Sequence, residues 1–321
     1  MSLSLSHILE NMEIGHNIIH GQYDFMDHPT LNSRDYEWDI VGTSKNWKRA
    51  HNFHHHAYTN IIGKDTDYGF GLFRFAKDVE WNPVHLLQPF IIPMSGLLFE
   101  YSIALYDLEI PRYILPKSLQ QEASRDRMPL KQLKSELLEF MNKSNKLVFK
   151  EFVALPLLAG PFAAKVALGN ASARVIRNVW AFAVIYCGHL TGGLWTHILS
   201  GHLSHQIEHH LYPDLPAWRY RELGPKVQAI CERYGIPYHT DTLPKQLKTV
   251  AVNVVKYAVP PTEKLPIWLQ KALKKGQPLL SKIQRNAKET LDKPKQILES
   301  AVQLSFPAKK QKNQTKLASA A

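Results

Sequence analysis

Histidines recur at helical spacing in three short segments of the chain. The first segment is EIGHNIIHG, the second is HNFHHHAYTN, and the third, GHLSHQIEHHLYPDLP, packs four histidines into nine positions. An α-helix turns about 100° per residue, so positions i, i+3 and i+4 share one face. His56 is rotated away from its group, and we interpret it as a neighbour rather than a ligand. The groups are His16 with His20; His51 with His54 and His55; and Gln206 with His209 and His210, with His205 one turn before His209.

Such groups predict metal binding. Two imidazoles one helical turn apart can bind one ion, and neutral imidazole suits zinc, copper, iron and nickel. A zinc site takes three or four protein ligands, so three groups are too many for one zinc and enough for two metal ions. The HExxH signature of zinc proteases does not occur in the sequence. The Glu-x-x-His pair that soluble di-iron carboxylate bundles need twice occurs once, at Glu13 and His16.

The positive charge of the chain lies mostly at its C-terminal end. Residues 262–321 contain 13 Lys and Arg against 4 Asp and Glu, which is +9 of the total of +11. A basic segment with few aromatic residues is typical of a solvated tail, which an anionic membrane surface would attract. No nucleic-acid-binding motif accompanies the charge, so we expect no nucleic-acid partner. We therefore predict a domain over residues 1–260 and a basic, partly disordered tail over residues 261–321.

Three apolar windows approach the length of about 20 residues that a membrane helix needs. They are residues 86–106, 152–169 and 179–199. Each is interrupted by residues that lipid-facing helices avoid, namely Pro89, Pro93, Glu100, Lys165, His189 and His197. From hydropathy alone, buried helices of a soluble protein are an equal alternative. In a membrane, the second and third windows would form a hairpin with Arg174 and Arg177 in its far turn, and the first window would lie in the interface.

In this order, HxxxH, HxxHH and QxxHH resemble the three histidine boxes of the integral-membrane fatty acid desaturases, in the bacterial acyl-CoA or acyl-lipid branch. The flanking residues agree in EIGHNIIHGQYDFMDHP, WKRAHNFHHHAYTNIIGKDTDYG and SHQIEHHLYPDLPAWRY. The resemblance implies one further ligand from the last membrane helix, for which His189 is our candidate and His205 a weaker one. It places Glu208 and Gln206 behind the ligands. The box ligands that it implies are His16, His20, His51, His54, His55, His209 and His210.

The resemblance also implies a fold and a reaction. The fold is all-α, with membrane-embedded helices and a cytoplasmic helical cap that holds a di-metal site. The cofactor is two non-haem iron ions, and the substrates are O2 and a fatty acyl-CoA or acyl-lipid, which gains a cis double bond. The chain has no haem-binding HPGG motif and no flavin signature, so electrons come from a separate carrier such as ferredoxin with its reductase. The implied location is the bacterial inner membrane, with the site facing the cytoplasm.

Three carboxylates near the boxes, Asp24, Asp65 and Asp67, are candidates for orienting the ligands, but we favour solvated loop charges or caps for all three.

The length of the chain before the first box raises a further expectation. Family members carry apolar spans before the first box, whereas His16 comes too early for one, so we expect an N-terminally truncated chain. A catalytically inactive remnant that retains metal-binding motifs is therefore an alternative. A related di-iron lipid hydroxylase and a soluble zinc-binding protein are the others.

Overall fold

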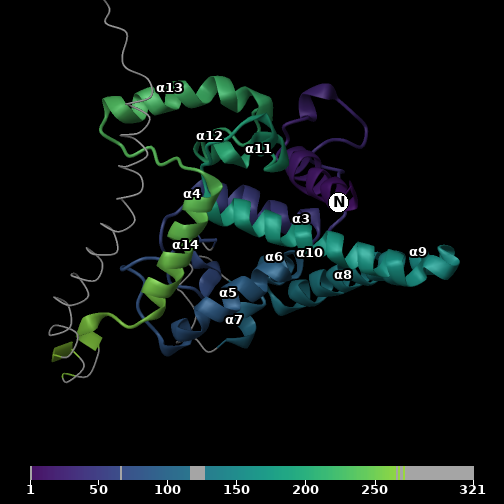
Figure 1. The fold of residues 1–321 in the computed structure, drawn as a ribbon, viewed down its shortest axis with the longest axis horizontal. Helices are drawn as coiled ribbons and strands as arrows, with labels where there is room; N and C mark the ends of the chain where they lie inside the picture. The colour runs from purple at the N-terminus through teal and green to yellow at the C-terminus, as the bar shows by residue number, and fades with distance from the viewer. Residues whose placement is uncertain (1, 66, 116–126, 265–266, 268–269, 272–321) are drawn as a thin grey trace, which may run out of the picture. The chain divides into compact units, whose positions relative to one another are not determined.

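The computed structural model describes residues 2–65, 67–115, 127–264, 267 and 270–271. Over these residues the chain is helical and contains no strand, as expected of an all-α fold (Figure 1). Contacts group residues 1–260 into one compact unit and residues 261–321 into another. The predicted disorder of the tail stays a prediction, because most of that segment lies outside the described residues.

Short helices with unusual hydrogen bonding carry the first two boxes. Two of them are π-helices, in which an N–H bonds to the carbonyl five residues earlier. In this way the N–H of His16 bonds to Asn11 O, and the N–H of His56 bonds to His51 O. The elements are α1 (Ser2–Ile8), π-helix η1 (Leu9–Gly15), α2 (His16–Ile19), η2 (Asp24–Met26), α3 (Ser44–Trp47), π-helix η3 (Lys48–His55), α4 (His56–Tyr58) and η4 (Gly69–Gly71).

The next segment bends sharply. After η5 (Pro83–Leu87), α5 (Gln88–Leu97) and α6 (Phe99–Asp107) meet at Leu98, and α7 (Pro111–Ile114) follows. In the described part of the chain, no individual helix combines the length and apolar character needed to cross a membrane. The pair Pro83–Leu97 and Phe99–Asp107, bent by 103°, reaches that length and composition only jointly.

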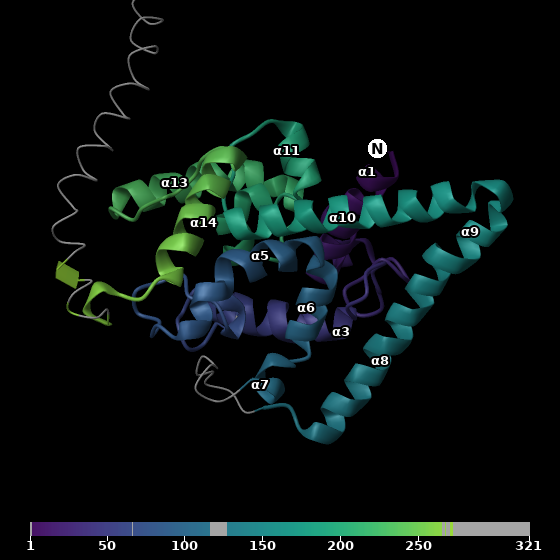
Figure 2. The same ribbon diagram turned by 60° about the horizontal axis from the view of Figure 1, so that its bottom comes forward.

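A long helical hairpin follows, but with other boundaries than expected. It comprises α8 (Leu130–Phe149), π-helix η7 (Lys150–Ala154), α9 (Leu155–Leu158), η8 (Gly160–Phe162) and α10 (Ala163–Cys187). Figure 2 shows α8 leading to α9 at one end of α10, which then runs back across the molecule. The turn falls at Gly160, whose φ is +53°, and Pro161, because this pair cannot continue α9.

The predicted hairpin was therefore wrong in its turn and in its second span. Arg174 and Arg177 lie inside α10 rather than in a far turn, and both are buried because they pair with Glu100 at 2.7 Å. The third window does not form one helix, because α10 stops before Gly188, whose φ is +70°.

The C-terminal part carries the third box. It comprises α11 (Leu194–Leu199), η9 (Leu203–His205), α12 (Gln206–Leu211), η10 (Ala217–Arg219), α13 (Tyr220–Arg233), α14 (Leu243–Ala258) and η11 (Thr262–Lys264). At Gly201, with φ +61°, a Cβ atom would lie 2.1 Å from Met12 O. Only glycine permits this approach, so Gly201 lets the third box lie against η1 and the first box.

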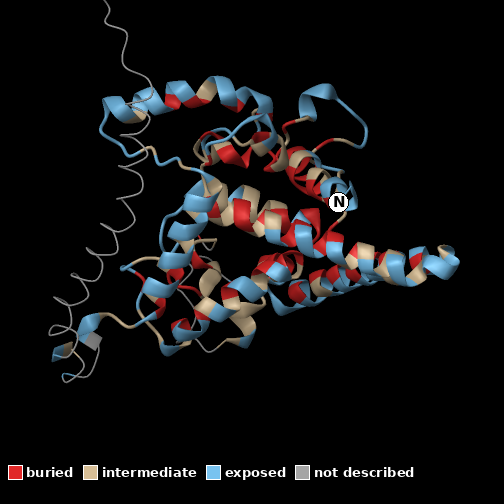
Figure 3. Ribbon diagram, in the orientation of Figure 1, coloured by how far each residue is buried: buried red, intermediate tan, exposed pale blue. Residues whose placement is uncertain are grey.

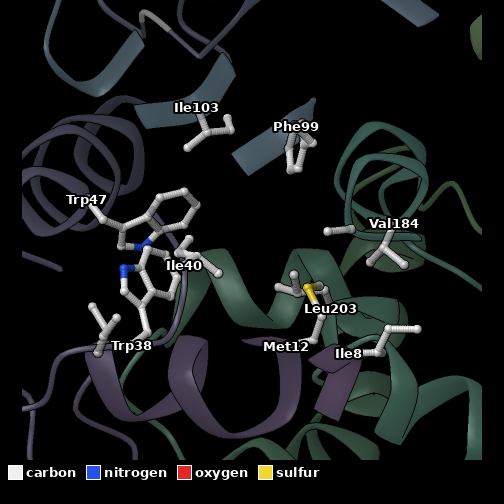
Figure 4. Close-up of a cluster of buried hydrophobic side chains, with 11 residues drawn as sticks. Ile8, Met12, Trp38, Ile40, Trp47, Phe99, Ile103, Val184 and Leu203 are labelled. Carbon is white, nitrogen blue, oxygen red and sulfur yellow. The ribbon is translucent and has the colours of Figure 1, made fainter. Parts of the chain in front are cut away.

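The core is built around α10, which contacts α1, α5, α6 and α14. Its inward face is buried, and so is much of the segments that carry the first and third boxes, whereas the second box is mostly half-buried (Figure 3). A cluster of apolar side chains from these elements surrounds a common interior (Figure 4). Among them, Trp38, Trp47, Met12, Phe99 and Ile103 come from three separate parts of the chain. Burial of these large side chains stabilises the arrangement by about 1.5–3 kcal/mol each, and it holds the three boxes around one site.

Candidate metal centre

Seven histidines from the three boxes meet in one place, which we call the histidine cluster. Neighbouring ring centroids in the cluster lie between 4.6 and 6.2 Å apart. The members are His16, His20, His51, His55, His56, His209 and His210. Six of these were predicted as ligands from the sequence, and the seventh, His56, was not.

The second box differs from the expected α-helical spacing because η3 is a π-helix. Its i to i+5 hydrogen bonding brings the ring of His56 edge-on to that of His51 at 4.9 Å, while the ring of His55 stacks on His51 at the same distance. The ring of His56 lies 4.7 Å from that of His20 and 4.8 Å from that of His209. The ring of His54, in contrast, packs edge-on against the exposed Phe53 at 5.0 Å. The structure thus corrects the sequence-based placement, with His56 inside the cluster and His54 outside it.

The nitrogen atoms of the cluster fit a metal. The Nε2 atoms of His20, His51 and His209, and both nitrogens of His56, are buried without a hydrogen-bond partner. A buried polar atom without a partner is costly and rare, and it indicates a ligand that would satisfy it. One nitrogen from each of His16, His20, His51 and His209 lies within 4.8 Å of the others, and His51, His55 and Asp67 form a second such group. The Nε2 atoms of His55 and His210 are 3.0 Å apart.

The cluster is electrostatically prepared for a cation. Burial, the largest cause, lowers the pKa of His16 to about 4, that of His210 to about 3 and that of His56 to about 2. It also lowers the pKa of His20, His51 and His209 well below the usual value. These imidazoles are therefore neutral at neutral pH, which leaves their lone pairs available to a metal.

His55 is the exception, because carboxylates stand behind it. Burial opposes its charge, but a hydrogen bond with Asp65 and the charge of Asp67 outweigh burial and raise its pKa. His55 Nδ1 lies 3.0 Å from both carboxylate oxygens of Asp65. The backbone N–H groups of Asn60 and Asp67 also donate to Asp65. Such carboxylates fix the orientation of a histidine ligand and raise its basicity.

Asp67 plays a similar part for His51. Its Oδ2 lies 3.3 Å from His51 Nδ1, and the hydroxyl of Tyr106 donates to its Oδ1 at 2.7 Å. The sequence-based interpretation of Asp65 and Asp67 as solvated loop charges is wrong, since Asp65 is only 3% exposed. Their DxD spacing just after the box was the available signal. Asp24, in contrast, accepts hydrogen bonds from Ser33 in an exposed turn, as expected of a loop residue.

Neutral partners hold other rings of the cluster. His16 Nδ1 lies 3.1 Å from Asn17 Oδ1, and His209 Nδ1 lies 3.4 Å from the Tyr220 hydroxyl. Gln206 Nε2 lies 3.3 Å from His210 Nε2, so the predicted supporting residue Gln206 does contact the cluster. In four rings, the Nδ1 atom therefore contacts a residue that is not part of the histidine cluster. These rings are His16, His51, His55 and His209. The Nε2 atom remains for a metal.

His189, His205 and Glu208 form a separate group with Tyr238, which we call the Glu208 group. Glu208 Oε2 lies 3.1 Å from His189 Nε2 and 3.7 Å from His205 Nδ1, and the Tyr238 hydroxyl donates to Glu208 Oε1 at 2.8 Å. Burial would raise the pKa of Glu208, but hydrogen bonds with His189 and Tyr238, together with the nearby His205 ring, lower it to about 2. Both ring nitrogens of His205 are buried without a hydrogen-bond partner, and His189, His205 and Glu208 lie close enough together to hold a metal ion. The structure does not bring His189 and His205 into the histidine cluster, and their predicted role as ligands stays a prediction.

A cavity of about 390 Å³ opens onto the histidine cluster at His16, His51, His55 and His210. Its remaining lining is largely apolar and comes from η1, α6, α10 and the loop around Phe70. This size and lining are typical of a pocket for an apolar small molecule. The cavity places such a molecule directly beside the buried nitrogens.

These features define a protein that is helical over its described residues, with a histidine cluster that could hold metal ions beside an apolar cavity. Comparison with known proteins gives the family. The family model for fatty acid desaturases matches residues 189–242. Over 295 residues the chain is 36% identical to the NADPH-dependent stearoyl-CoA 9-desaturase of Mycobacterium tuberculosis, which covers 81% of this chain and 67% of the relative. The chain belongs to the fatty acid desaturase family, a family of oxidoreductases.

More distant relatives agree. The sn-1 linoleoyl-lipid 6-desaturase of Synechocystis sp. is 24% identical over 274 residues, covering 74% of this chain and 73% of the relative. Fatty acid desaturase 3 of Homo sapiens is 38% identical over 63 residues, which is 20% of this chain and 13% of the relative. No solved structure matches the chain at a significant level.

Proposed function

We propose that the chain uses O2 to introduce a cis double bond into a fatty acyl chain at a di-iron centre in the histidine cluster. The observation that carries this proposal is the apolar cavity that opens onto buried, neutral imidazoles in a member of the desaturase family. The acyl group is a CoA thioester or a lipid ester, as in the names of the two bacterial relatives.

Two adjacent methylene groups lose one hydrogen each, O2 is reduced to two molecules of water, and an external carrier supplies two electrons, with two protons from solvent. A ferredoxin with its reductase is our candidate carrier, and the mycobacterial relative is NADPH-dependent by name. Bound iron supplies the oxidant for C–H bonds that no side chain can break.

The protein has four tasks in this reaction. The seven imidazoles of the histidine cluster hold the irons, and five of them, His16, His20, His51, His55 and His209, belong to two groups that share His51. Asp65 and Asp67 orient His55 and His51, and Tyr106 fixes Asp67 by its hydrogen bond. Trp38, Trp47, Ile103 and other apolar side chains of the cavity bind the methylene chain and exclude water from the site.

The proposal includes placement in a membrane, with the histidine cluster on the cytoplasmic side. The bent pair α5 and α6 supports this placement, and so do large apolar side chains that the fold leaves outside. Phe90 on α5 is 73% exposed, and Leu158 on α9 is 84% exposed. Exposure of large apolar side chains to water is unfavourable, whereas their contact with the hydrocarbon of a bilayer is favourable. Resistance of the expressed chain to alkaline carbonate extraction would support this placement.

The test is expression with ferredoxin and its reductase, followed by gas chromatography of total fatty acids and iron analysis of the purified chain. We expect iron in the protein and a new unsaturated acid, both lost in His20→Ala. A hydroxylated acid instead would identify a lipid hydroxylase. Iron without any new product, under conditions that support a known desaturase, would identify an inactive remnant. Zinc in place of iron would contradict the proposal.

A further inference from the structure

The cavity extends away from the histidine cluster along two helices. On α10, both Arg177 and Cys187 line it, and the ten residues of α-helix from one to the other span about 15 Å. On α6, both Tyr106 and Glu100 line it. Because the Tyr106 hydroxyl donates to Asp67, which contacts His51, the Tyr106 side faces the cluster. Glu100, six residues back along α6, therefore lies at the far end.

The C-terminal end of α10 lies on the same side as Tyr106. The ring of Tyr186 stacks on Phe70 at 5.6 Å, and Phe70 meets Tyr106 edge-on at 5.1 Å. Arg177, nine residues before Tyr186, lies toward the far end, where its Nη2 atom is 2.7 Å from Glu100 Oε1. The two helices thus define the same axis, with imidazoles at one end and an ion pair at the other.

Two glutamates and two arginines close the far end of the cavity, and their charges sum to zero. Glu100 pairs with Arg177 and Arg174, and Arg174 also pairs with Glu151. All four side chains are buried, with Arg177 only 2% exposed. Removing or displacing one member would leave a buried charge without its partner, which is strongly unfavourable. The network is therefore a rigid wall, in contrast to the apolar side chains between it and the cluster.

We infer that the Glu100–Arg177 ion pair is the floor of the acyl cavity and sets the longest methyl-terminal segment that the enzyme accepts. This inference rests on the proposed function. The methyl end of the acyl chain packs against the ion pair, and the distance from there to the histidine cluster selects the carbons that react. Ala181, one turn after Arg177 on α10, lines the cavity between the two ends and is 4% exposed. Its small side chain keeps the path to the floor open.

Two variants move the floor in opposite directions. Ala181→Leu fills the path one turn above the ion pair and shortens the cavity. The double variant Glu100→Ala with Arg177→Leu removes one charge of each sign, leaves Arg174 paired with Glu151, and lengthens the cavity. Ala183→Leu is the matched control, since Ala183 is buried on the same helix but is not part of the cavity lining.

The first readout is binding of saturated acyl-CoAs, from dodecanoyl-CoA to eicosanoyl-CoA, to the metal-free full chain in detergent. We expect affinity to rise with chain length up to a limit, and this limit to shift to shorter chains in Ala181→Leu and to longer chains in the double variant. The second readout is activity on the same series, where a methylene group that no longer fits changes kcat/KM by about tenfold or more. Ala183→Leu should leave both profiles unchanged.

The outcomes separate the inference from the proposed function. If acyl-CoAs bind with a length limit that neither variant moves, the ion pair is not the floor and the inference is wrong. If no acyl chain binds to the wild type and none is desaturated, the proposed function fails together with the inference. If the double variant does not fold, a length limit that is the same in Ala181→Leu and in the wild type would still overturn the inference.

Discussion

The histidine cluster and the Glu208 group both contain buried imidazoles, but they differ in which groups contact the ring nitrogens. In the cluster, the Nε2 atoms of His20, His51 and His209 are buried without a partner. In the Glu208 group, His189 Nε2 lies within hydrogen-bond distance of both Glu208 and Tyr238. The first arrangement is incomplete without a cation. In the second, a carboxylate and a hydroxyl satisfy His189, whereas both ring nitrogens of His205 are buried without a hydrogen-bond partner. The density of histidines in a sequence therefore does not locate a metal; the partners of each nitrogen do.

The comparison also separates their roles. The Glu208 group ties segments around the third box together, since His189 lies just after α10, Glu208 lies in α12 and Tyr238 lies between α13 and α14. We interpret it as an anchor for α12, which carries His209 and His210 into the cluster. Each prediction below changes a residue in, or in contact with, one of the two groups.

The largest effect should come from removing a ring at the centre of the cluster. His20→Ala deletes an imidazole that contacts His16, His51, His56 and His209. Loss of a supporting residue costs about 10–100-fold in metal affinity, and loss of a ligand should cost at least about 100-fold. Iron per chain and desaturation should both fall to background. The exposed His239 supplies the control, and His239→Ala should retain both.

The second box offers a matched pair of neighbours. The π-helix places His56 inside the cluster and His54 against Phe53. His56→Ala should therefore lose iron and activity, and His54→Ala should retain most of both, as measured by iron analysis and product yield. An ordinary α-helix would reverse the result. Loss of iron in His54→Ala with retention in His56→Ala would contradict the π-helical register.

A smaller effect should follow from changing a carboxylate behind the cluster. Asp65→Asn keeps the shape of the side chain but removes the charge that raises the pKa of His55. Iron affinity should fall by about 10–100-fold, which a competition titration with a chelator would measure. Asp24→Asn, in an exposed turn away from the cluster, should leave the affinity unchanged. Equal affinity in Asp65→Asn and the wild type would show that Asp65 does not support the site.

Acid should destabilise the metal-free protein through the cluster. The pKa of His16 falls to about 4 in the folded state from 6.5, so below pH 6.5 the unfolded chain binds a proton that the folded chain does not. Stability is therefore lost as pH falls from about 6.5 toward about 4, by about 1.4 kcal/mol per pH unit for each such histidine. Thermal unfolding in detergent would measure this slope, which should become shallower in His16→Asn. A midpoint that does not change between neutral pH and about pH 5 would contradict the burial of neutral imidazoles.

The smallest effect should come from the Glu208 group. Tyr238→Phe removes a hydroxyl that donates to Glu208 at 2.8 Å. We expect a loss of about 1 kcal/mol in the free energy of unfolding, measured in the metal-free protein, with iron per chain unchanged. A loss of iron without a loss of stability would place this group in the metal centre.

The sequence predicts much of the site because the identity and order of the box residues can be recognised before the fold is known. Six of the seven rings in the cluster come from residues that the boxes identify, and Gln206 contacts His210 as expected. The error at His54 and His56 has a physical cause. Spacing was interpreted with α-helical geometry, whereas the chain forms a π-helix from Lys48 to His55, which nothing in the local pattern of apolar residues reveals.

The fold was predicted less completely. The all-α class follows from the resemblance to the desaturase family, but the hairpin boundaries depended on Arg174 and Arg177 being exposed. Their charges are instead compensated by Glu100 and Glu151, which lie 74 and 23 residues from Arg174 in the chain. Partners so distant in sequence cannot be identified from a window of hydropathy. The same holds for Gly201, whose need to be glycine depends on the backbone of Met12.

The most direct test of the central claim is the iron content of the double variant His205→Ala with Glu208→Gln, compared with the wild type. It disrupts the Glu208 group and leaves all seven rings of the histidine cluster in place. If the cluster alone holds the metal, the purified folded variant contains as much iron per chain as the wild type. If the variant loses one or both irons while its helical content is unchanged, and Tyr238→Phe, which weakens the same anchor, retains both, the metal centre includes the Glu208 group and the distinction between the two groups is wrong.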